Sequence, residues 1–347
     1  MRASGITRRR LLAGGTALAA AGLTGACGRG GTSAAGAPPA EKVTVLTGAS
    51  FQGREAPLFV AKQMGWFRDA GLEVQVLAGK GTTENLKMLA SGQATFATLD
   101  VSGAIIEYTN PKPDAIRNFT MTAVLHQTTL ACFVALASSG ISTPRDLAGK
   151  TLSYLPGGVN KLLFDTYAEL ADFDPSKVTW VSNPIATQHA GLLAARKVDA
   201  ISQFVPAVQS VEAVAKQELA VLAFADVMGS LHGSAIGVTT ETARTKPDLV
   251  RRFNGALVEA LRWSLDHPEQ AGQIYADQPE TKSQPVELAV AEIKAMTGYV
   301  KGQAGSQIGH FNLERVAQNI AILKGAQAIT NADDLMPEHI VTPSLVP

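Results

Sequence analysis

The chain has 347 residues, with 30 basic and 30 acidic side chains, and 46% of its residues are hydrophobic. The balanced charge argues against a nucleic-acid partner and against a general affinity for anionic membranes. The hydrophobic content is ordinary for a globular protein, and the length predicts two domains.

The first 26 residues have the pattern of an export signal. Arg8–Arg10 precede an apolar run that is too rich in Gly and Ala for a convincing permanent membrane span. The alternative is an uncleaved membrane anchor. Residues 27–40 are mostly Gly, Ser, Ala and Pro and are expected to form a flexible tether. The folded body is therefore expected to begin near Glu41.

Two short motifs in this segment resemble bacterial export sequences. Thr7–Leu12 resembles the twin-arginine motif, in which two arginines precede a residue and an apolar pair. Leu23–Cys27 resembles a lipobox, although Thr24 stands where that pattern has Leu or Val. The resemblance implies export and lipidation of Cys27. Cys132, in an apolar stretch, is then left without a disulfide partner and is expected to be a buried, inert thiol.

Strands and helices alternate from Val43 to Asp100. Short apolar runs rich in Val, Thr and Phe are typical of buried parallel strands, and the segments between them carry apolar residues at helical spacing. Repeated βαβ units give a parallel sheet whose ligands bind at the carboxyl ends of the strands. The expected strands are Val43–Leu46, Glu73–Leu77 and Thr95–Thr98, and the expected helices are Pro57–Asp69 and Thr82–Ala90.

A second αβ series begins at Lys150, after a helix at Val101–Tyr108 and strands at Met121–Leu125 and Leu130–Leu136. Two series of similar size predict two similar α/β lobes. The expected strands of the second series are Lys150–Leu155, Lys177–Val181, Ala200–Phe204 and Ala220–Ala225, and its helices are Lys161–Leu170, Thr187–Ala195 and Pro206–Lys216. A strand at Ser234–Thr239 and helices at Asp248–Leu265, Pro285–Val300 and Leu313–Leu323 follow.

Several segments of the chain resemble the substrate-binding proteins of bacterial ABC importers, in the group that serves nitrate, taurine, alkanesulfonates and thiamine-pyrimidine precursors. The resemblance implies the α/β fold of two-lobed, type II periplasmic binding proteins, with two hinge crossovers that close on a ligand. It spans Val43 to the C-terminus and is carried by Leu58–Lys62, Gly65–Phe67, Gly71–Val74, Ser91–Ala97, Ile141–Lys150, Leu193–Ala200, Ile308–Phe311 and Asp333–Leu335.

The resemblance also implies how the chain is divided and what it binds. The natural crossings are Phe133–Ala137 and Ile236–Thr240. Lobe 1 is then residues 41–137 and 234–347, and lobe 2 is residues 138–233. The implied partners are a small-molecule ligand and an ABC permease with its ATPase. The protein is expected to be a monomer that binds no nucleic acid.

Loops that lead into helices supply the first candidate ligand contacts. Such loops present backbone N–H groups and the positive end of the helix dipole, which favours an anionic or electronegative ligand. Gly79–Thr83 is one such loop, and Gly157–Asn160 is the matching loop of the second lobe. Lys80 could touch the ligand or be solvated, and the two threonines could instead cap the helix. The expected contacts here are Gly81, Thr82, Thr83, Gly158 and Asn160.

The loop after the first strand supplies Phe51, Gln52 and Arg54. Phe51 could stack on a ring or pad the lobe. Arg54 could hold a carboxylate, sulfonate or phosphate, or it could pair with Glu55. Asp100 ends a strand at the same edge, with N-capping as the alternative. Gln127, near the hinge, and Gln203 and Phe204, at the end of a second-lobe strand, complete the expected set; His126 and His232 were weighed beside them.

The sequence predicts a binding protein and not an enzyme. The six histidines are widely spaced, and neither a nucleophile elbow nor a phosphate loop occurs, so no metal and no cofactor are expected. The related thiamine-pyrimidine synthases carry a cysteine-rich metal motif that this chain lacks. The expected ligand is a small organic anion such as a sulfonate. The alternatives are a pyrimidine-type thiamine precursor stacked on Phe51 and Phe204, or a ligand sensor of the same fold.

Overall fold

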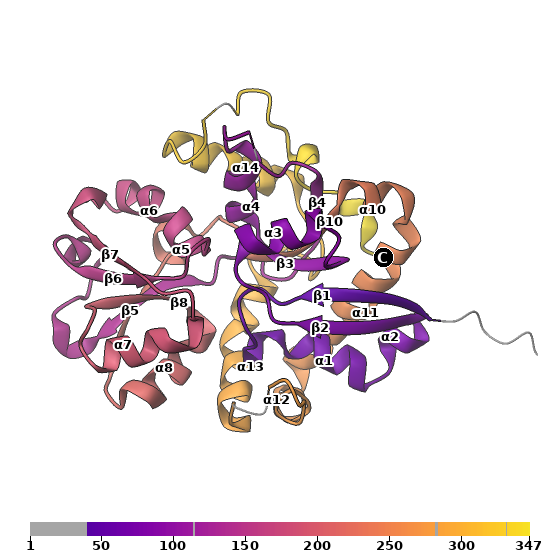
Figure 1. Cartoon of the computed structure of the whole chain (residues 1–347), viewed down its shortest axis with the longest axis horizontal. Coiled ribbons are helices and arrows are strands. Elements are labelled where there is room, and N and C mark those ends of the chain that lie inside the picture. The colour runs from indigo at the N-terminus through magenta and orange to yellow at the C-terminus, as the bar shows by residue number, and fades with distance from the viewer. Residues whose placement is uncertain (1–39, 114, 282–283, 331) are drawn as a thin grey trace, which may run out of the picture. The chain divides into compact units, whose positions relative to one another are not determined.

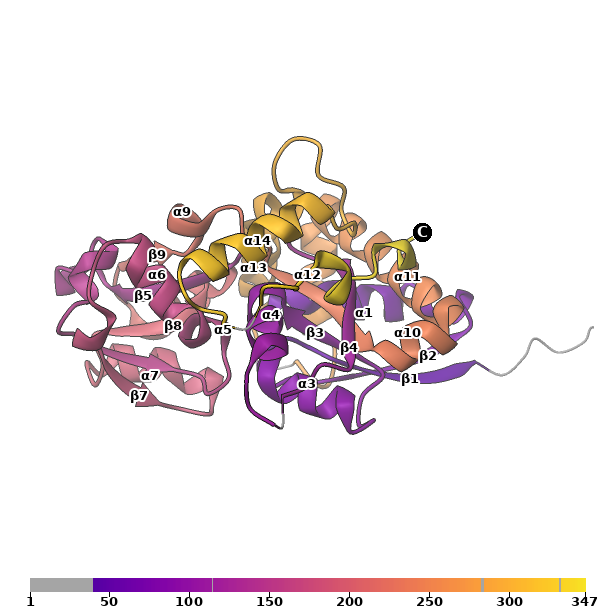
Figure 2. The ribbon, with the colours of Figure 1, turned by 90° about the horizontal axis from the view of Figure 1, so that it is seen from above.

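The computed structural model describes residues 40–113, 115–281, 284–330 and 332–347. The expected signal peptide, Cys27 and nearly all of the tether lie outside these residues. Within them, no helix has the length and apolar character needed to cross a membrane. The fold consists of two five-stranded sheets with helices packed on them (Figure 1, Figure 2).

The first sheet comes mainly from the start of the chain. β1 pairs in parallel with β2 and β3, whereas β10 runs antiparallel to both of its neighbours. The end of β3 and the start of β10 therefore lie at one edge, where Asp100 pairs with Ser234. The strand order is β2-β1-β3-β10-β4, with β1 at Glu41–Leu46, β2 at Leu72–Leu77, β3 at Phe96–Asp100, β4 at Phe119–Val124 and β10 at Ser234–Thr239.

The second sheet repeats this arrangement. β6 pairs in parallel with β7 and β8, and β5 runs antiparallel to both of its neighbours. Each sheet thus contains one antiparallel strand that the chain enters from the other sheet. The strand order is β7-β6-β8-β5-β9, with β5 at Ala131–Leu136, β6 at Thr151–Tyr154, β7 at Thr179–Ser182, β8 at Ala200–Phe204 and β9 at Leu219–Ala223.

The chain passes between the sheets at different residues from those predicted. Most of Phe133–Ala137 lies in β5 and pairs with β8 and β9, and most of Ile236–Thr240 lies in β10 and pairs with β3 and β4. Both predicted crossings are therefore wrong by several residues. The reason is burial: β5 is buried at every position, as the centre of a sheet requires. The residue ranges of the two lobes stay a prediction.

Two helices expected to be continuous are each divided. The segment Pro57–Asp69 forms α1 (Ala56–Gln63) and α2 (Trp66–Asp69), because Gly65 between them has a left-handed φ of +81°. The segment Lys161–Leu170 forms part of α5 (Val159–Leu162) and α6 (Phe164–Leu170). The other helices are α3 (Thr82–Ala90), α4 (Val101–Thr109), α7 (His189–Ala194), α8 (Val208–Ala215), α9 (Ala225–Met228), α10 (Thr240–Thr245), α11 (Pro247–Asp266), α12 (Pro268–Ala276), α13 (Val286–Lys301) and α14 (Leu313–Gly325).

Helices from the end of the chain complete the packing of both sheets. The apolar stripe of α11 is buried, and its Phe253 stacks on Phe96 of β3 with 3.8 Å between ring centroids. α13 contacts α12 and also α8, a helix of the second series (Figure 1). Cys132 is fully buried in β5, as expected, and burial raises the pKa of its thiol.

Candidate ligand-binding site

A cavity lies where the carboxyl ends of strands from the two sheets approach each other. Its lining comes from the ends of β3 and β8, from the start of β10, and from loops that follow strands of both sheets. This is the edge at which open α/β sheets bind their ligands. The cavity has a volume of about 50 Å³, which suits a small ligand.

Nine of the twelve predicted contact residues line this cavity. They come from both sheets and from the helices and loops beside them, so the site depends on residues far apart in the chain. Their contact with a ligand stays a prediction. The nine are Gln52, Arg54, Gly81, Thr82, Asp100, Gly158, Asn160, Gln203 and Phe204.

Phe51 is one of the three predicted residues that do not line the cavity. Its ring packs on Phe59 of α1, with 5.9 Å between the ring centroids. The preceding residue, Ser50, has a left-handed φ of +61°, and the loop turns there. Phe51 lines a neighbouring groove, whereas Phe204 lines the cavity, so the stacking of a ligand on both rings stays a prediction.

Thr83 and Gln127 also lie outside the lining, because other parts of the protein use their polar groups. Thr83 Oγ1 donates to a carboxylate oxygen of Glu107 at 2.6 Å. Gln127 Nε2 donates to the backbone carbonyls of Gln307 and His310. These partners are distant in sequence, so local motifs could not show that the polar groups of Thr83 and Gln127 are already hydrogen-bonded.

Three further candidates for ligand contact, Lys80, His126 and His232, do not line the cavity either. Lys80 is exposed. His232 is buried, with its Nδ1 2.8 Å from Asn319 Oδ1. His126 is buried beneath Arg54, and burial lowers the pKa of its imidazole to about 3, so this side chain is neutral.

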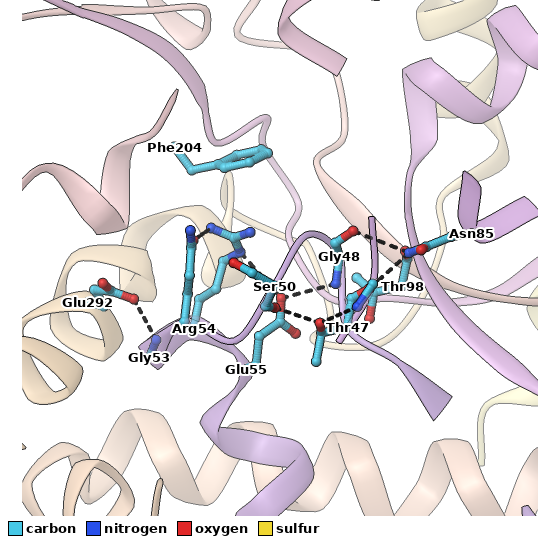
Figure 3. A network of polar contacts seen from close by, with 12 residues as sticks. Thr47, Gly48, Ser50, Gly53, Arg54, Glu55, Asn85, Thr98, Phe204 and Glu292 are labelled. Atoms are coloured by element: carbon cyan, nitrogen blue, oxygen red, sulfur yellow. Dashed lines mark hydrogen bonds and ion pairs between the residues drawn. The ribbon is translucent and has the colours of Figure 1, made fainter. Parts of the chain in front are cut away.

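Arg54 supplies a buried cation to the cavity, with only 6% of its surface exposed. Its Cζ lies 4.2 Å from the ring centroid of Phe204, a contact that joins the two sheets (Figure 3). Nη1 donates to Gln52 Oε1, and Nε lies 3.4 Å from Glu55 Oε1. A guanidinium has five N–H groups, so Arg54 retains donors for a ligand.

Two buried acids interact electrostatically with this cation. Burial raises the pKa of Glu55, although the charge of Arg54 acts against that rise. Burial also raises the pKa of Glu292, which accepts hydrogen bonds from Gly53 N at 2.5 Å and from Ser210 Oγ at 2.8 Å. Burial thus opposes the ionisation of both acids, and the charge of Arg54 favours it.

Asp100 stands at the cavity end of β3. One of its carboxylate oxygens accepts a hydrogen bond from Gly103 N at 2.9 Å and so caps α4. Burial nevertheless raises the pKa of Asp100 to about 7. The capping alternative therefore holds for Asp100, while its carboxyl group also lines the cavity.

The N–H groups expected to be free in the first loop are in use. Gly79 N, Lys80 N and Gly81 N each donate within the protein, so the expectation that they face an anion is wrong for these three. Two of the acceptors belong to the loop after β1, and the third belongs to the side chain of Asn85 on α3. The acceptors are Thr47 Oγ1 at 2.9 Å, Asn85 Oδ1 at 3.0 Å and Gly48 O at 2.9 Å, respectively.

Two hydroxyl groups of the lining were missed by the sequence reading. Thr98 Oγ1 and Ser202 Oγ are buried and have no hydrogen-bond partner among the described residues. Thr98 lies two residues before Asp100 in β3, and Ser202 lies two residues before Phe204 in β8. Because alternate residues of a strand share a face, this spacing was a usable signal. Lys161, His189 and Ser234 also line the cavity and were not predicted.

The donor groups around the cavity do not form a metal site. Among the described residues, no three His, Cys, Asp or Glu side chains are grouped closely enough to hold a metal ion. Beside Asp100, Lys161 and His189, the lining holds the guanidinium of Arg54, buried hydroxyls and an aromatic ring, groups that suit an organic or oxyanion ligand.

Comparison with known proteins identifies one family and many solved structures with a similar fold. The model of the family described as NMT1/THI5 like matches residues 52–271. No curated protein sequence matches the chain.

Solved structures resemble this chain over most of its length. The periplasmic nitrate-binding protein NrtA from Synechocystis PCC 6803 has a TM-score of 0.70 at 15% identity, over 89% of this chain and 88% of that one. The ligand-binding component of an ABC-type import system from Staphylococcus aureus has 0.66 at 10%, over 88% and 97%. The alkanesulfonate-binding protein SsuA from Xanthomonas axonopodis pv. citri, bound to MOPS, has 0.65 at 13%, over 90% and 99%. At these identities the likeness shows the fold, and it confirms the predicted α/β fold of two-lobed periplasmic binding proteins.

Proposed function

Because the chain belongs to the NMT1/THI5-like family, we propose that it is the exported solute-binding protein of an ABC importer. The predicted resemblance to the nitrate- and sulfonate-binding group is confirmed for family and fold. Export, the lipid anchor on Cys27, and delivery to a permease and its ATPase belong to the proposal. The arginines at Arg8–Arg10 and the small residues before Cys27 support them.

The proposed ligand is a small organic anion with a carboxylate, sulfonate or similar head group. The observation that carries this choice is Arg54, a buried guanidinium that lines the cavity. A planar guanidinium matches the geometry of two oxygen atoms of such a head group. The hydroxyls of Thr98 and Ser202, which line the cavity and lack partners in the described structure, are proposed to bind its remaining oxygens.

Binding is proposed to be noncovalent, with the ligand held between the two sheets and no reaction catalysed. The buried His189 that lines the cavity is hydrogen-bonded to Asn183 and to Ser153, a fully buried serine that is not part of the lining. Burial lowers the pKa of His189, so this imidazole is neutral at neutral pH. The role of the site is then selection and transfer of a solute.

Thermal unfolding of the purified protein with a ligand panel tests the proposal. The panel contains sulfonates, nitrate, carboxylates, pyrimidines and flavins. A ligand at a hundred times its dissociation constant stabilises the protein by about 2.7 kcal/mol and raises the melting temperature. Stabilisation by an organic anion supports the proposal. Stabilisation by pyrimidines or flavins alone, or by no member of the panel, contradicts the proposed ligand class.

Arg54→Lys tests the residue on which the ligand class depends. Lysine keeps the positive charge but loses the planar pair of donors, so the affinity for the anion is expected to fall at least tenfold. Arg68→Lys is the matched control, because Arg68 is exposed on α2 and pairs with Asp69 at 2.9 Å. Isothermal titration calorimetry measures both variants, and equal affinity for wild type and Arg54→Lys would remove Arg54 from the binding site.

Cys27→Ser tests the lipid anchor in cells. A lipidated Cys27 holds the protein in the membrane fraction, so the serine variant is expected to appear in the soluble fraction. Cys132→Ala is the control. Because Cys132 is buried in β5, this variant is expected to leave membrane association unchanged. A Cys27→Ser protein that stays with membranes would contradict lipidation at this residue.

A further inference from the structure

We infer that the ligand carries an apolar tail, which binds in a groove beside the cavity. The inference rests on the proposed function, since it describes the part of the ligand beyond the anionic head that meets Arg54. Its substrate class is an alkyl or aryl sulfonate or carboxylate with several carbon atoms, as opposed to an inorganic anion such as nitrate.

Two helical stripes from different parts of the chain form the walls of the groove. On one side, α8 and the turn before it present Ala207, Val211 and Val214. On the other side, the start of α13 presents Pro285 and Leu288. In each stripe the residues are three or four positions apart and so lie on one face of the helix. The groove therefore has apolar side chains on both walls.

The groove adjoins the ligand cavity. Gln52, Ala186 and Gln203 line both spaces and form their shared boundary. Gln52 Oε1 accepts from Arg54, and Gln203 Oε1 accepts from Phe204 N at 2.9 Å, which fixes both amides at the boundary. A ligand with its head at Arg54 reaches the groove by passing these two side chains.

The groove presents little charge to a tail. Glu292 is one of its lining residues, but it is only 1% exposed and both of its carboxylate oxygens accept hydrogen bonds, from Gly53, Ser210 and Gln284. Val214, by contrast, leaves 52% of its surface exposed. Burying such apolar surface under a hydrocarbon tail is favourable, whereas a nitrate ion would leave it in water.

The affinity of the protein for linear sulfonates of increasing length tests whether a tail binds in the groove. Methane-, butane- and octanesulfonate are titrated into the protein by calorimetry. Each methylene buried in the groove is expected to tighten binding about fourfold. The double variant Val214→Ser, Leu288→Ser is expected to flatten this dependence on chain length and to leave the affinity for methanesulfonate unchanged. Val221→Ser is the matched control, because Val221 is an exposed valine, at 38%, on β9 and outside the groove.

The outcomes separate this inference from the proposed function. Affinity that rises with chain length in wild type and in Val221→Ser, but not in the double variant, supports the groove. Equal affinity for all three sulfonates overturns the groove and leaves an anion-binding protein. A steep dependence that the double variant retains also overturns the groove, since the tail then binds elsewhere. Failure of every sulfonate to bind overturns the inference for sulfonates, and stabilisation by a carboxylate of the ligand panel would still support the proposed function.

Discussion

Arg54 and Asp100 line the cavity, and Glu55 and Glu292 are buried within electrostatic reach of Arg54; burial of charge is costly unless partners compensate. The partners are present: Arg54 faces Glu55, and backbone N–H groups of Gly48 and Gly53 donate to the two glutamates (Figure 3). The remaining cost is visible as raised pKa values of the acids. Such a cluster is typical of a functional site, because a core without ligands gains nothing from it.

The raised pKa of Asp100 predicts a loss of stability with rising pH. The folded protein keeps a proton on Asp100 up to about pH 7, whereas the unfolded chain releases it near the ordinary value of 3.8. The folded state thus binds more protons between these values, so the free energy of unfolding falls as pH rises from about 4 to 7. Asp100→Asn removes this contribution while keeping an oxygen to cap α4. Urea unfolding of wild type and variant at pH 5 and pH 8 measures the difference.

Asp174→Asn is the control for this titration. Asp174 is an exposed capping residue whose pKa is lowered, mainly by its hydrogen bonds with Ser176, so it stays ionised throughout this range. Burial raises the pKa values of Glu55 and Glu292 in the same direction, so Asp100→Asn is expected to remove only part of the slope. An unchanged slope in Asp100→Asn would show that Asp100 titrates normally.

Among the elements, α13 links the two αβ series by packing against a helix of the second one. It follows the last strand of the first sheet in the chain, yet it packs against α8, and Glu292 on α13 accepts from Ser210 on α8. Hydrogen bonds to a buried carboxylate are among the stronger ones, at about 1.5–3 kcal/mol. This one crosses from one series of elements to the other.

Ser210→Ala is expected to loosen this connection. The carboxylate of Glu292 loses one donor but keeps Gly53 and Gln284, so the expected loss is about 1–2 kcal/mol in the free energy of unfolding. Ser176→Ala, at an exposed turn, is the control and should change stability by less than about 0.5 kcal/mol. Chemical denaturation measures both; equal midpoints for the two variants would mean that the Ser210 hydrogen bond contributes nothing.

Two glycines in helical segments are expected to respond to alanine in opposite directions. Gly65, between α1 and α2, has a φ of +81°, and an added Cβ would lie 2.5 Å from Arg68 Nη2, so Gly65→Ala should destabilise the protein by about 1 kcal/mol. Gly191 lies in α7 with nothing within 4 Å of an added Cβ, so Gly191→Ala should stabilise it by about 0.5–1 kcal/mol. Thermal unfolding compares them, and the same sign for both would contradict the backbone explanation.

For the whole molecule, contacts between the sheets indicate a closed form. Arg54 lies over Phe204, and Thr83 Oγ1 is 3.4 Å from the carbonyl oxygen of Gly157. Few polar groups make these contacts, and the chain passes between the sheets in only short segments. Proteins of this architecture close around ligands by hinge motion, which needs a small free-energy difference between open and closed forms.

Small-angle X-ray scattering tests closure. Without ligand, the radius of gyration in solution is expected to exceed the value calculated from residues 40–347 of this structure. It should fall when an anion from the panel is added at saturation. Phe204→Ala removes the ring on which Arg54 rests and should reduce the ligand-induced change. A radius that is the same with and without a bound ligand would mean that the protein binds without closing.

Much of the fold follows from local sequence. The alternation of apolar runs and helical stripes predicts the strands and helices, and loops at strand ends predict nine residues of the cavity, because strand ends of parallel sheets meet at one edge. Local pattern reports which face of an element is buried. It therefore sufficed for the two α/β series and for nine residues of the cavity lining.

The partners of individual side chains were decided only by tertiary structure. Thr83 lies in the first turn of α3 and Gln127 lies in a loop, and Glu107 and Gln307 are hydrogen-bonded to their polar groups. The pairing of Arg54 with Phe204 and the groove between α8 and α13 join segments that are far apart in the chain. Local spacing cannot report such contacts, since they depend on which strands pair and how the two sheets face each other.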